Sequence, residues 1–119
     1  MNIVLKSNGL KLKFKLLDNE TLYGKFKIHK NYQGYDDISH GGIISAVLVS
    51  SMINLFYMKD GMKLKTAKLN IRYRKPIPVE KTITIRAVAN NNIRHFHRAK
   101  SRIIPGNTIF ADAEGYFRN

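Results

Sequence analysis

Apolar and polar residues alternate with a repeat of two along most of the chain, which is typical of strands with one buried and one solvated face. Residues 10–16 place leucine and phenylalanine on one face and lysine on the other. The turn-forming residues Asp18, Asn19 and Glu20 follow, and the alternation returns over residues 21–28. We therefore predict a β-hairpin in the N-terminal part of the chain.

The same alternation returns after residue 60 and fills the C-terminal half. Its four segments are residues 66–76, 82–89, 94–104 and 109–117. Pro76 and Pro78 end the first of them, and runs of asparagine or proline and glycine separate the others. This half of the chain is predicted to be a meander of about four strands.

Between the two strand blocks, residues 41–59 form an apolar run that predicts a long helix. The run is apolar nearly all round, so the helix must be wrapped by other elements rather than laid on a surface. One face of the later strands carries small residues that would let a helix approach a curved sheet closely. These residues are Ala87, Ala89, Ala99, Ser101, Ala111, Ala113 and Gly115.

Length and composition narrow the class of protein. A chain of 119 residues with 44% hydrophobic residues is expected to form a single domain, residues 1–119, around one core. No membrane span and no signal peptide are expected from the sequence, and we predict a cytoplasmic location. The absence of cysteine excludes disulfides, thiolate catalysis and cysteine metal sites.

The predicted elements follow one another as two strands, a loop, a long buried helix and four strands. This is the element order of the hotdog fold. The segments "YQGYDDISHGGIISAVL", "TAKLNIRYRKPIPV" and "ADAEGYF" resemble the thioesterase superfamily typified by phenylacetyl-CoA and 4-hydroxybenzoyl-CoA thioesterases. The resemblance implies an α+β chain in which a curved antiparallel sheet of about six strands wraps a long central helix. It also implies a homodimer, or a tetramer, whose sheets join edge to edge and whose acyl-CoA sites lie at the subunit interface.

Two glycines at the start of the predicted helix provide a candidate site for carbonyl chemistry. The first amide N–H groups of a helix have no partner within it, and the helix dipole adds partial positive charge there. Gly41 and Gly42 leave this end open to a thioester carbonyl, with the Gly42 N–H as the first choice of donor. The resemblance gives His40 a role in shaping the corner. In the alternative interpretation, the glycines only permit a sharp entry into a packed helix.

The carboxylate that members of the superfamily carry nine residues after the histidine is replaced here by Val49. A valine can neither accept a proton nor attack a carbonyl. The resemblance places a polar helper at Thr66, which could order a water. The residues that could replace this acid in catalysis are Ser50, Ser51, Asp36 and Asp37. A loop carboxylate directly before a helix, however, more often caps the helix.

The formal net charge of +13 is spread mostly over the polar faces of the strands. Arg72, Arg74 and Lys75 are candidates to hold the phosphates of coenzyme A, because their strand leads from the site to the surface. His95 and His97 lack a third ligand in sequence, so we predict no metal site. A nucleic-acid partner ranks last, since no recognised nucleic-acid-binding signature is present.

The sequence therefore predicts an acyl-CoA thioesterase-like protein with an atypical active site and no cofactor beyond the coenzyme A of its ligand. Whether it is an enzyme stays open. The missing carboxylate favours the alternative, a noncatalytic acyl-CoA binding protein or sensor, and the net charge alone suggests the third, a nucleic-acid binder.

Overall fold

The computed structural model describes residues 2–7, 10–18, 20–28, 33–35, 38–39, 41–104 and 108–119. Along the chain, the strands before the helix are β1 (Asn2–Ser7), β2 (Leu10–Leu16), β3 (Thr21–Lys27), β4 (Gln33–Tyr35) and β5 (Ile38–Ser39). The helix α1 (Gly41–Asp60) follows, and then β6 (Lys65–Tyr73), β7 (Thr82–Ile93), β8 (Phe96–Ile104) and β9 (Ala111–Arg118).

The main sheet has seven strands in the order β1-β2-β3-β7-β8-β9-β6, and each neighbouring pair is antiparallel. The predicted hairpin is β2 and β3, and the four predicted C-terminal strands are β6 to β9. Only β7, β8 and β9 form a meander, because β6 pairs with β9 and lies at the edge of the sheet. The N-terminal strand β1 and the separate β4–β5 pair were not predicted.

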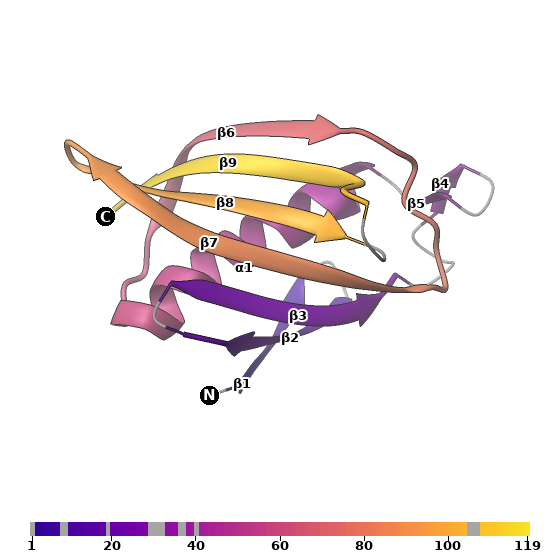
Figure 1. Ribbon diagram of the computed structural model, residues 1–119, viewed down its shortest axis with the longest axis horizontal. Coiled ribbons are helices and arrows are strands. Elements are labelled where there is room, and N and C mark those ends of the chain that lie inside the picture. Colours follow the sequence, from indigo (N-terminus) through magenta and orange to yellow (C-terminus); the bar gives the residue numbers. More distant parts are fainter. Residues whose placement is uncertain are drawn as a thin grey trace.

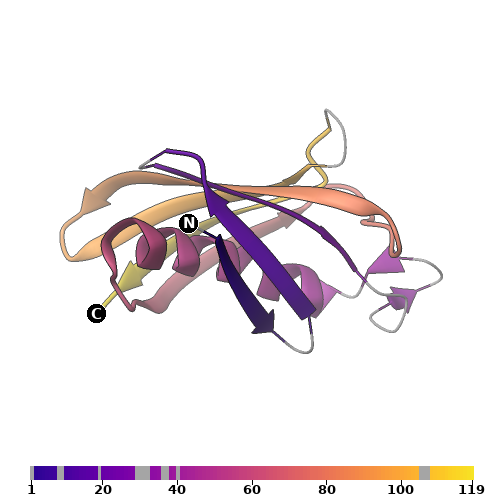
Figure 2. The same cartoon turned by 90° about the horizontal axis from the view of Figure 1, so that it is seen from below.

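The helix α1 lies against one face of the curved sheet, as two views at right angles show (Figures 1 and 2). Leu48, Met52 and Leu55 on the helix are fully buried, and so are Leu22 and Ile85 on the sheet. Fully burying a side chain of this size contributes about 1.5–3 kcal/mol, so the helix and sheet stabilise each other. The prediction of a long helix wrapped by an antiparallel sheet is confirmed.

Small residues on the inner face let the helix approach the sheet, as the sequence predicts. Ala87, Ala99, Ser101 and Ala111 have no exposed surface. At Gly115, an added Cβ would lie 2.5 Å from the ring of Phe117 and 3.2 Å from Met52 Cε. A larger residue would therefore displace the Phe117 ring, which packs against Phe56 of the helix.

The helix ends at a glycine in the left-handed conformation. Gly61 has a φ of 71°, its N–H donates to Tyr57 O at 2.8 Å, and the N–H of Met62 donates to Phe56 O at 3.4 Å. The bond from Gly61 to Tyr57 O is that of the αL motif, which satisfies a carbonyl group at a helix end. The chain can then reverse into β6, which runs back alongside the helix toward its N-terminus (Figure 1).

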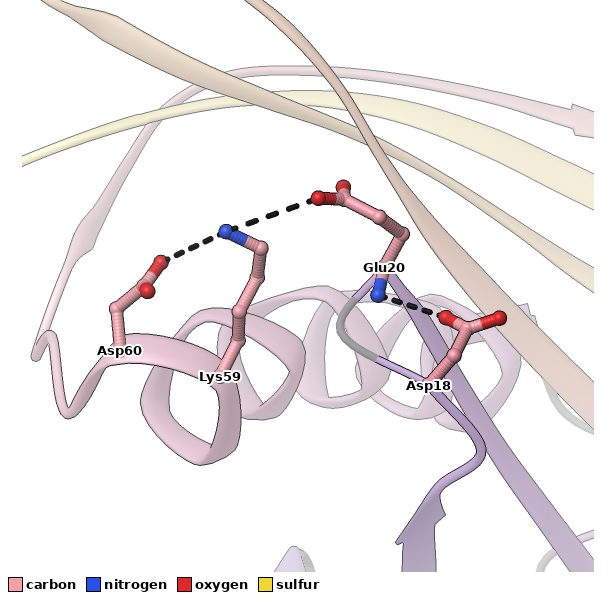
Figure 3. A network of polar contacts seen from close by, with 4 residues as sticks. All are labelled: Asp18, Glu20, Lys59 and Asp60. Carbon is pink, nitrogen blue, oxygen red and sulfur yellow. Dashed lines mark hydrogen bonds and ion pairs between the residues drawn. The ribbon is translucent and has the colours of Figure 1, made fainter.

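A polar network connects this end of the helix to the β2–β3 turn (Figure 3). Lys59 Nζ lies 3.0 Å from Asp60 Oδ2 and 4.0 Å from Glu20 Oε1. Asp18 Oδ1 accepts the Glu20 N–H at 2.7 Å, which is the side-chain turn that aspartate favours. The predicted turn chemistry at residues 18–20 is confirmed for Asp18 and Glu20.

By length and composition α1 is also apolar enough to cross a membrane, contrary to the expectation from the sequence. A core helix passes the same test, and here residues such as Val47, Leu48 and Met52 are buried within the protein. The buried residues, 44% of the apolar window, account for part of this apolar composition.

Candidate functional site

The N-terminal end of α1 is open to solvent. Gly41 and Gly42 are exposed, whereas the next two residues, Ile43 and Ile44, are buried. A Cβ added at Gly41 would meet only the Tyr73 hydroxyl, at 4.0 Å, and the φ of Gly41 is outside the left-handed region. Among the residues that the structure describes, neither packing nor backbone conformation therefore demands glycine at position 41. Gly41 leaves its own position exposed at the helix front, where the backbone N–H groups and the helix dipole favour negative charge.

Two hydroxyl groups meet at this helix end. Ser45 Oγ lies 3.0 Å from Gly41 O, the Tyr73 hydroxyl lies 3.2 Å from the same oxygen, and the two hydroxyls hydrogen-bond to each other. Each hydroxyl has one proton, so only two of these three bonds can form at one time. One of the two hydroxyl groups can therefore donate its proton to a ligand while the backbone hydrogen bonds of the helix stay formed.

Gly41 and Tyr73 line a hollow of about 320 Å³. Its other lining residues are Ile44, Arg74, Lys75, Pro76 and Ile77. Ile44 and Ile77 are 2% and 3% exposed and give the hollow an apolar floor, whereas Arg74 and Lys75 are exposed at its rim. The hollow thus combines an apolar surface, a helix front and two cations.

The cations at the rim are held by the strand β9 and the residue before it. Arg74 Nε donates to Asp112 Oδ1 at 2.8 Å, and this hydrogen bond, with the charge attraction of Asp112, raises the pKa of the Arg74 guanidinium. The backbone N–H groups of Arg74 and Lys75 both donate to Phe110 O, at 2.8 and 3.0 Å. Lys75 Nζ lies 5.8 Å from the centre of the Phe110 ring. These contacts hold Arg74 and Lys75 in place at the point where the chain leaves β6.

Arg72, the third predicted phosphate ligand, lies in a different place. It is exposed on β6 opposite Asp112 and lines a separate hollow with Asn70, Lys100 and Arg102. Strand alternation points it to the outer face of the sheet, away from α1. The structure therefore brings Arg74 and Lys75, but not Arg72, to the hollow at Gly41.

Val49 is half-buried two turns into α1. Ser45, Ala46 and Ile53 are also half-buried, at the three- and four-residue spacing that places them on one side of the helix. This partly exposed face contains the position at which the resemblance expects a carboxylate. No proton acceptor stands there, because the side chain of Val49 is apolar.

The two serines beside Val49 have different surroundings. Ser51 is fully buried, and its hydroxyl lies 2.6 Å from Leu48 O and 2.6 Å from Ser101 Oγ. This bonding makes Ser51 a structural residue of the helix–sheet contact. Ser50 is half-buried, and its carbonyl accepts the Asn54 side-chain N–H at 2.7 Å.

Thr66 is exposed near the start of β6, seven residues before Tyr73. Since a strand rises about 3.3 Å per residue, Thr66 lies roughly 20 Å along the strand from the residue that contacts Gly41. A single chain therefore does not bring Thr66 to the helix front. His40, Asp36 and Asp37 lie outside the described residues.

The sequence analysis missed Tyr73 and Ser45. Tyr73 follows Leu69 and Ile71 on the inward phase of β6, where it reads as one more core residue, yet it is 55% exposed. Its position at the end of the strand, directly before two cations, is the signal that could have identified it. Ser45 lies one turn after Gly41, so helix spacing could have placed it beside the glycines.

No protein-family model matches the sequence, and no curated protein sequence matches it either. Solved structures do match in fold. A phenylacetic acid degradation-related protein from Ralstonia eutropha matches with a TM-score of 0.78 and 16% identity, over 89% of this chain and 83% of that one.

Two further solved structures match equally well. The Escherichia coli PaaI protein of the phenylacetic acid degradation operon has a TM-score of 0.79 and 12% identity, with 89% and 81% of the two chains covered. Zebra fish thioesterase superfamily member 2 has a TM-score of 0.79 and 13% identity, with 88% and 78% covered. The chain therefore has the hotdog fold of thioesterase superfamily structures, and the fold predicted from the sequence is confirmed.

Proposed function

We propose that this protein binds an acyl-CoA thioester with the carbonyl oxygen at the front of α1. The observation that carries the proposal is the exposed Gly41 at the start of α1, which lines a hollow with an apolar floor and a cationic rim. The fold neighbours support it, because several of them are named as thioesterases. The apolar floor suits an acyl group, and the helix front suits the developing oxyanion of a thioester.

The expected activity is slow thioester hydrolysis. Backbone N–H groups in the first turn of α1 would polarise the carbonyl, and the hydroxyl pair of Ser45 and Tyr73 would orient a water or donate to the oxyanion. A missing general base typically lowers the rate by about 10²- to 10⁴-fold. Val49 supplies no general base, so hydrolysis would depend on water and on weaker proton acceptors nearby.

A second candidate function is noncatalytic binding of acyl-CoA by a carrier or sensor. The specific observation that favours it is the apolar side chain of Val49 on the partly exposed face of α1. Both functions require the same binding step. Steady-state release of free coenzyme A from a panel of acyl-CoA thioesters separates them, because a noncatalytic binder releases none above the uncatalysed rate.

The site is proposed to be completed in a homodimer. The strand β6 lies at the edge of the sheet, where unpaired backbone groups can pair with a second copy. Pairing of two β6 strands would continue the sheet across the two subunits. It would also bring Thr66 of one subunit toward the helix front of the other, which one chain alone does not do.

The phosphates of coenzyme A are assigned to Arg74 and Lys75. Both line the hollow at Gly41, and exposed cations beside a pocket attract and retain a phosphorylated ligand. Wild-type protein should bind coenzyme A in a calorimetric titration, and Lys75→Ala should bind it severalfold more weakly. An unchanged affinity would place the phosphates elsewhere.

A further inference from the structure

The cations of this protein gather on the outer face of the sheet, the side turned away from α1. Inner residues such as Phe14, Leu22, Ile85 and Ala113 are buried, so their neighbours in each strand point outward. Among the described residues, twelve lysine and arginine side chains have this outward phase, against two carboxylates, Asp112 and Glu114. The cations are Lys13, Lys15, Lys25, Lys27, Lys65, Lys68, Arg72, Arg86, Arg98, Lys100, Arg102 and Arg118.

The two carboxylates neutralise few of these cations. Asp112 is paired with Arg74, and Glu114 Oε2 lies 3.7 Å from Arg98 Nη2. Arg86 stands directly opposite Arg102 in the β7–β8 register, so two like charges adjoin on the same face, whereas on the β9 side Asp112 lies opposite Arg102 and Glu114 opposite Lys100. Among the described residues, no ion pair is formed by Arg86, Lys100 or Arg102. Like charges directly opposite each other destabilise a sheet, which a polyanion on this face would relieve.

Aromatic side chains stand among the cations at one end of this face. Tyr116 lies opposite Arg98 on one side and Lys68 on the other. Lys68 Nζ is 5.5 Å and Arg98 Cζ is 5.7 Å from the centre of the Tyr116 ring, and the Phe96 ring meets Tyr116 edge-on. The Nε of Arg98 is buried without an acceptor among the described residues.

A hollow of about 410 Å³ opens beside this aromatic pair. Its lining residues are Ala67, Lys68, Ile93, Arg94, Phe96 and Tyr116. Its surface is mainly apolar, with two cations at the rim. A planar aromatic ring that is attached to an anionic chain fits both features.

We propose that the outer face of the sheet binds single-stranded nucleic acid, with one base in the hollow beside Tyr116 and phosphates along the cations of β8. Proteins that bind single strands combine a positive surface with aromatic side chains on which bases stack, and both are present here. Arg98, Lys100 and Arg102 lie on alternate positions of one strand, about 6.6 Å apart, so the cations form a row. Recognition is through phosphate charge and base stacking rather than base sequence.

A membrane surface fits less well. Val88 and Ile93 are the large apolar side chains of β7 that are exposed, at 37% and 43%, and they stand apart along the strand. A duplex fits less well too, because a paired base cannot reach the hollow.

The test is fluorescence anisotropy of a labelled 20-nucleotide oligouridylate and a labelled oligodeoxythymidylate, titrated with the full chain at several salt concentrations. Log affinity should fall linearly with log salt, with a slope of about −3 if four or five phosphates are contacted. A duplex of the same length and vesicles of phosphatidylcholine with phosphatidylserine are the competing ligands. The single strand should bind more tightly than either.

Paired variants give the matched control. Lys100→Ala with Arg102→Ala should reduce the magnitude of the salt slope by roughly 1.4 and weaken binding on the order of tenfold. Lys63→Ala with Lys81→Ala removes the same charge from exposed loop positions and should change the slope little. Tyr116→Ala should weaken binding on the order of tenfold, whereas Tyr116→Phe should retain it.

Thermal melting of each variant establishes that a weaker affinity is not a loss of fold. Equal effects of the two double variants would overturn the proposal, because the outer face would then be no more important than any surface charge. Vesicles or duplex bound as tightly as the single strand would also overturn it, in favour of a membrane or of nonspecific attraction.

Discussion

The chemistry proposed for this protein depends most on Val49. An apolar side chain occupies the helix position where the superfamily resemblance expects a carboxylate, while the helix front at Gly41 stays open. Substrate polarisation and proton transfer are separate contributions to a hydrolytic rate, so the first can persist without the second. Binding should therefore be better preserved than turnover.

Restoring the acid tests this separation. Val49→Asp should raise acyl-CoA hydrolysis by about 10- to 1,000-fold, because a positioned general base contributes about 10² to 10⁴ in rate when its geometry is right. It should also lower the melting temperature, since Val49 is half-buried and a carboxylate there loses solvation. Release of coenzyme A is followed with a thiol reagent.

Val49→Asn is the matched control, because it has nearly the same shape as aspartate but cannot accept a proton. It should leave hydrolysis at the wild-type level. Fast turnover by wild type, with no gain from Val49→Asp, would contradict the account and would direct attention to Ser50, Asp36 and Asp37.

Gly41 is the residue through which the helix front is reached. Gly41→Val should weaken acyl-CoA binding at least tenfold, because the branched side chain covers the first turn. The fold should persist, since a Cβ at this position meets only the Tyr73 hydroxyl at 4.0 Å. Calorimetric binding and a melting curve of the same sample distinguish the two effects, and wild-type affinity in a folded variant would refute the role of Gly41.

At the scale of elements, close contacts between strands and helix depend on glycine at particular positions. A Cβ at Gly24 would lie 2.7 Å from the backbone oxygen of Lys13 and 3.1 Å from the Phe14 ring. Gly24→Ala should therefore destabilise the protein by about 1–3 kcal/mol, because the β2–β3 pair must shift. The matched substitution Gly41→Ala should be neutral or slightly stabilising, and equal chemical denaturation midpoints for the two variants would contradict this packing.

The ion pair between β6 and β9 determines how available Arg74 is to a ligand. Asp112→Asn should increase the affinity for coenzyme A a fewfold, because it frees Arg74 from its carboxylate partner. Arg74→Ala should decrease the affinity, more strongly at low salt than at high salt, since exposed charges are screened over about 8 Å at physiological ionic strength. The two variants should therefore shift the calorimetric affinity in opposite directions. A shift in the same direction would place the phosphate site elsewhere.

Alternation along the strands was sufficient to predict most elements but not their order in the sheet. The inward phase of β7, β8 and β9 is marked by residues such as Ala87, Ser101 and Ala113, which are buried as predicted. The position of β6 beside β9 depends on the return of the chain along α1, which no local pattern encodes. The strand β1 was missed because Ile3, Val4 and Leu5 are consecutive and therefore show no alternation of apolar and polar residues.

The candidate site was also predicted only in part, because some of its contacts depend on the order of the strands in the sheet. Gly41, Arg74 and Lys75 are close in the structure because β6 runs back beside the helix. The sequence analysis had assigned them to one acyl-CoA site together with Arg72, which lies elsewhere. Contacts between residues far apart in sequence, such as Ser45 with Tyr73 and Arg74 with Asp112, follow from the sheet order and could not be derived from spacing.

At the scale of the whole molecule, the free edge of β6 and the distance between Thr66 and the helix front both favour a dimer. Light scattering at micromolar concentration should give twice the chain mass of 13.7 kDa, or a multiple of that value for a tetramer. A mass equal to one chain would show that the site must be complete within a single subunit.

Acyl-CoA binding at the helix front is tested most directly by a crystal structure with a nonhydrolysable acyl-CoA analogue in which the thioester carbonyl is retained as a ketone. We expect the carbonyl oxygen about 2.7–3.2 Å from a backbone N–H in the first turn of α1, with the phosphates beside Arg74 and Lys75. A ligand bound with its carbonyl away from this helix end would contradict this expectation.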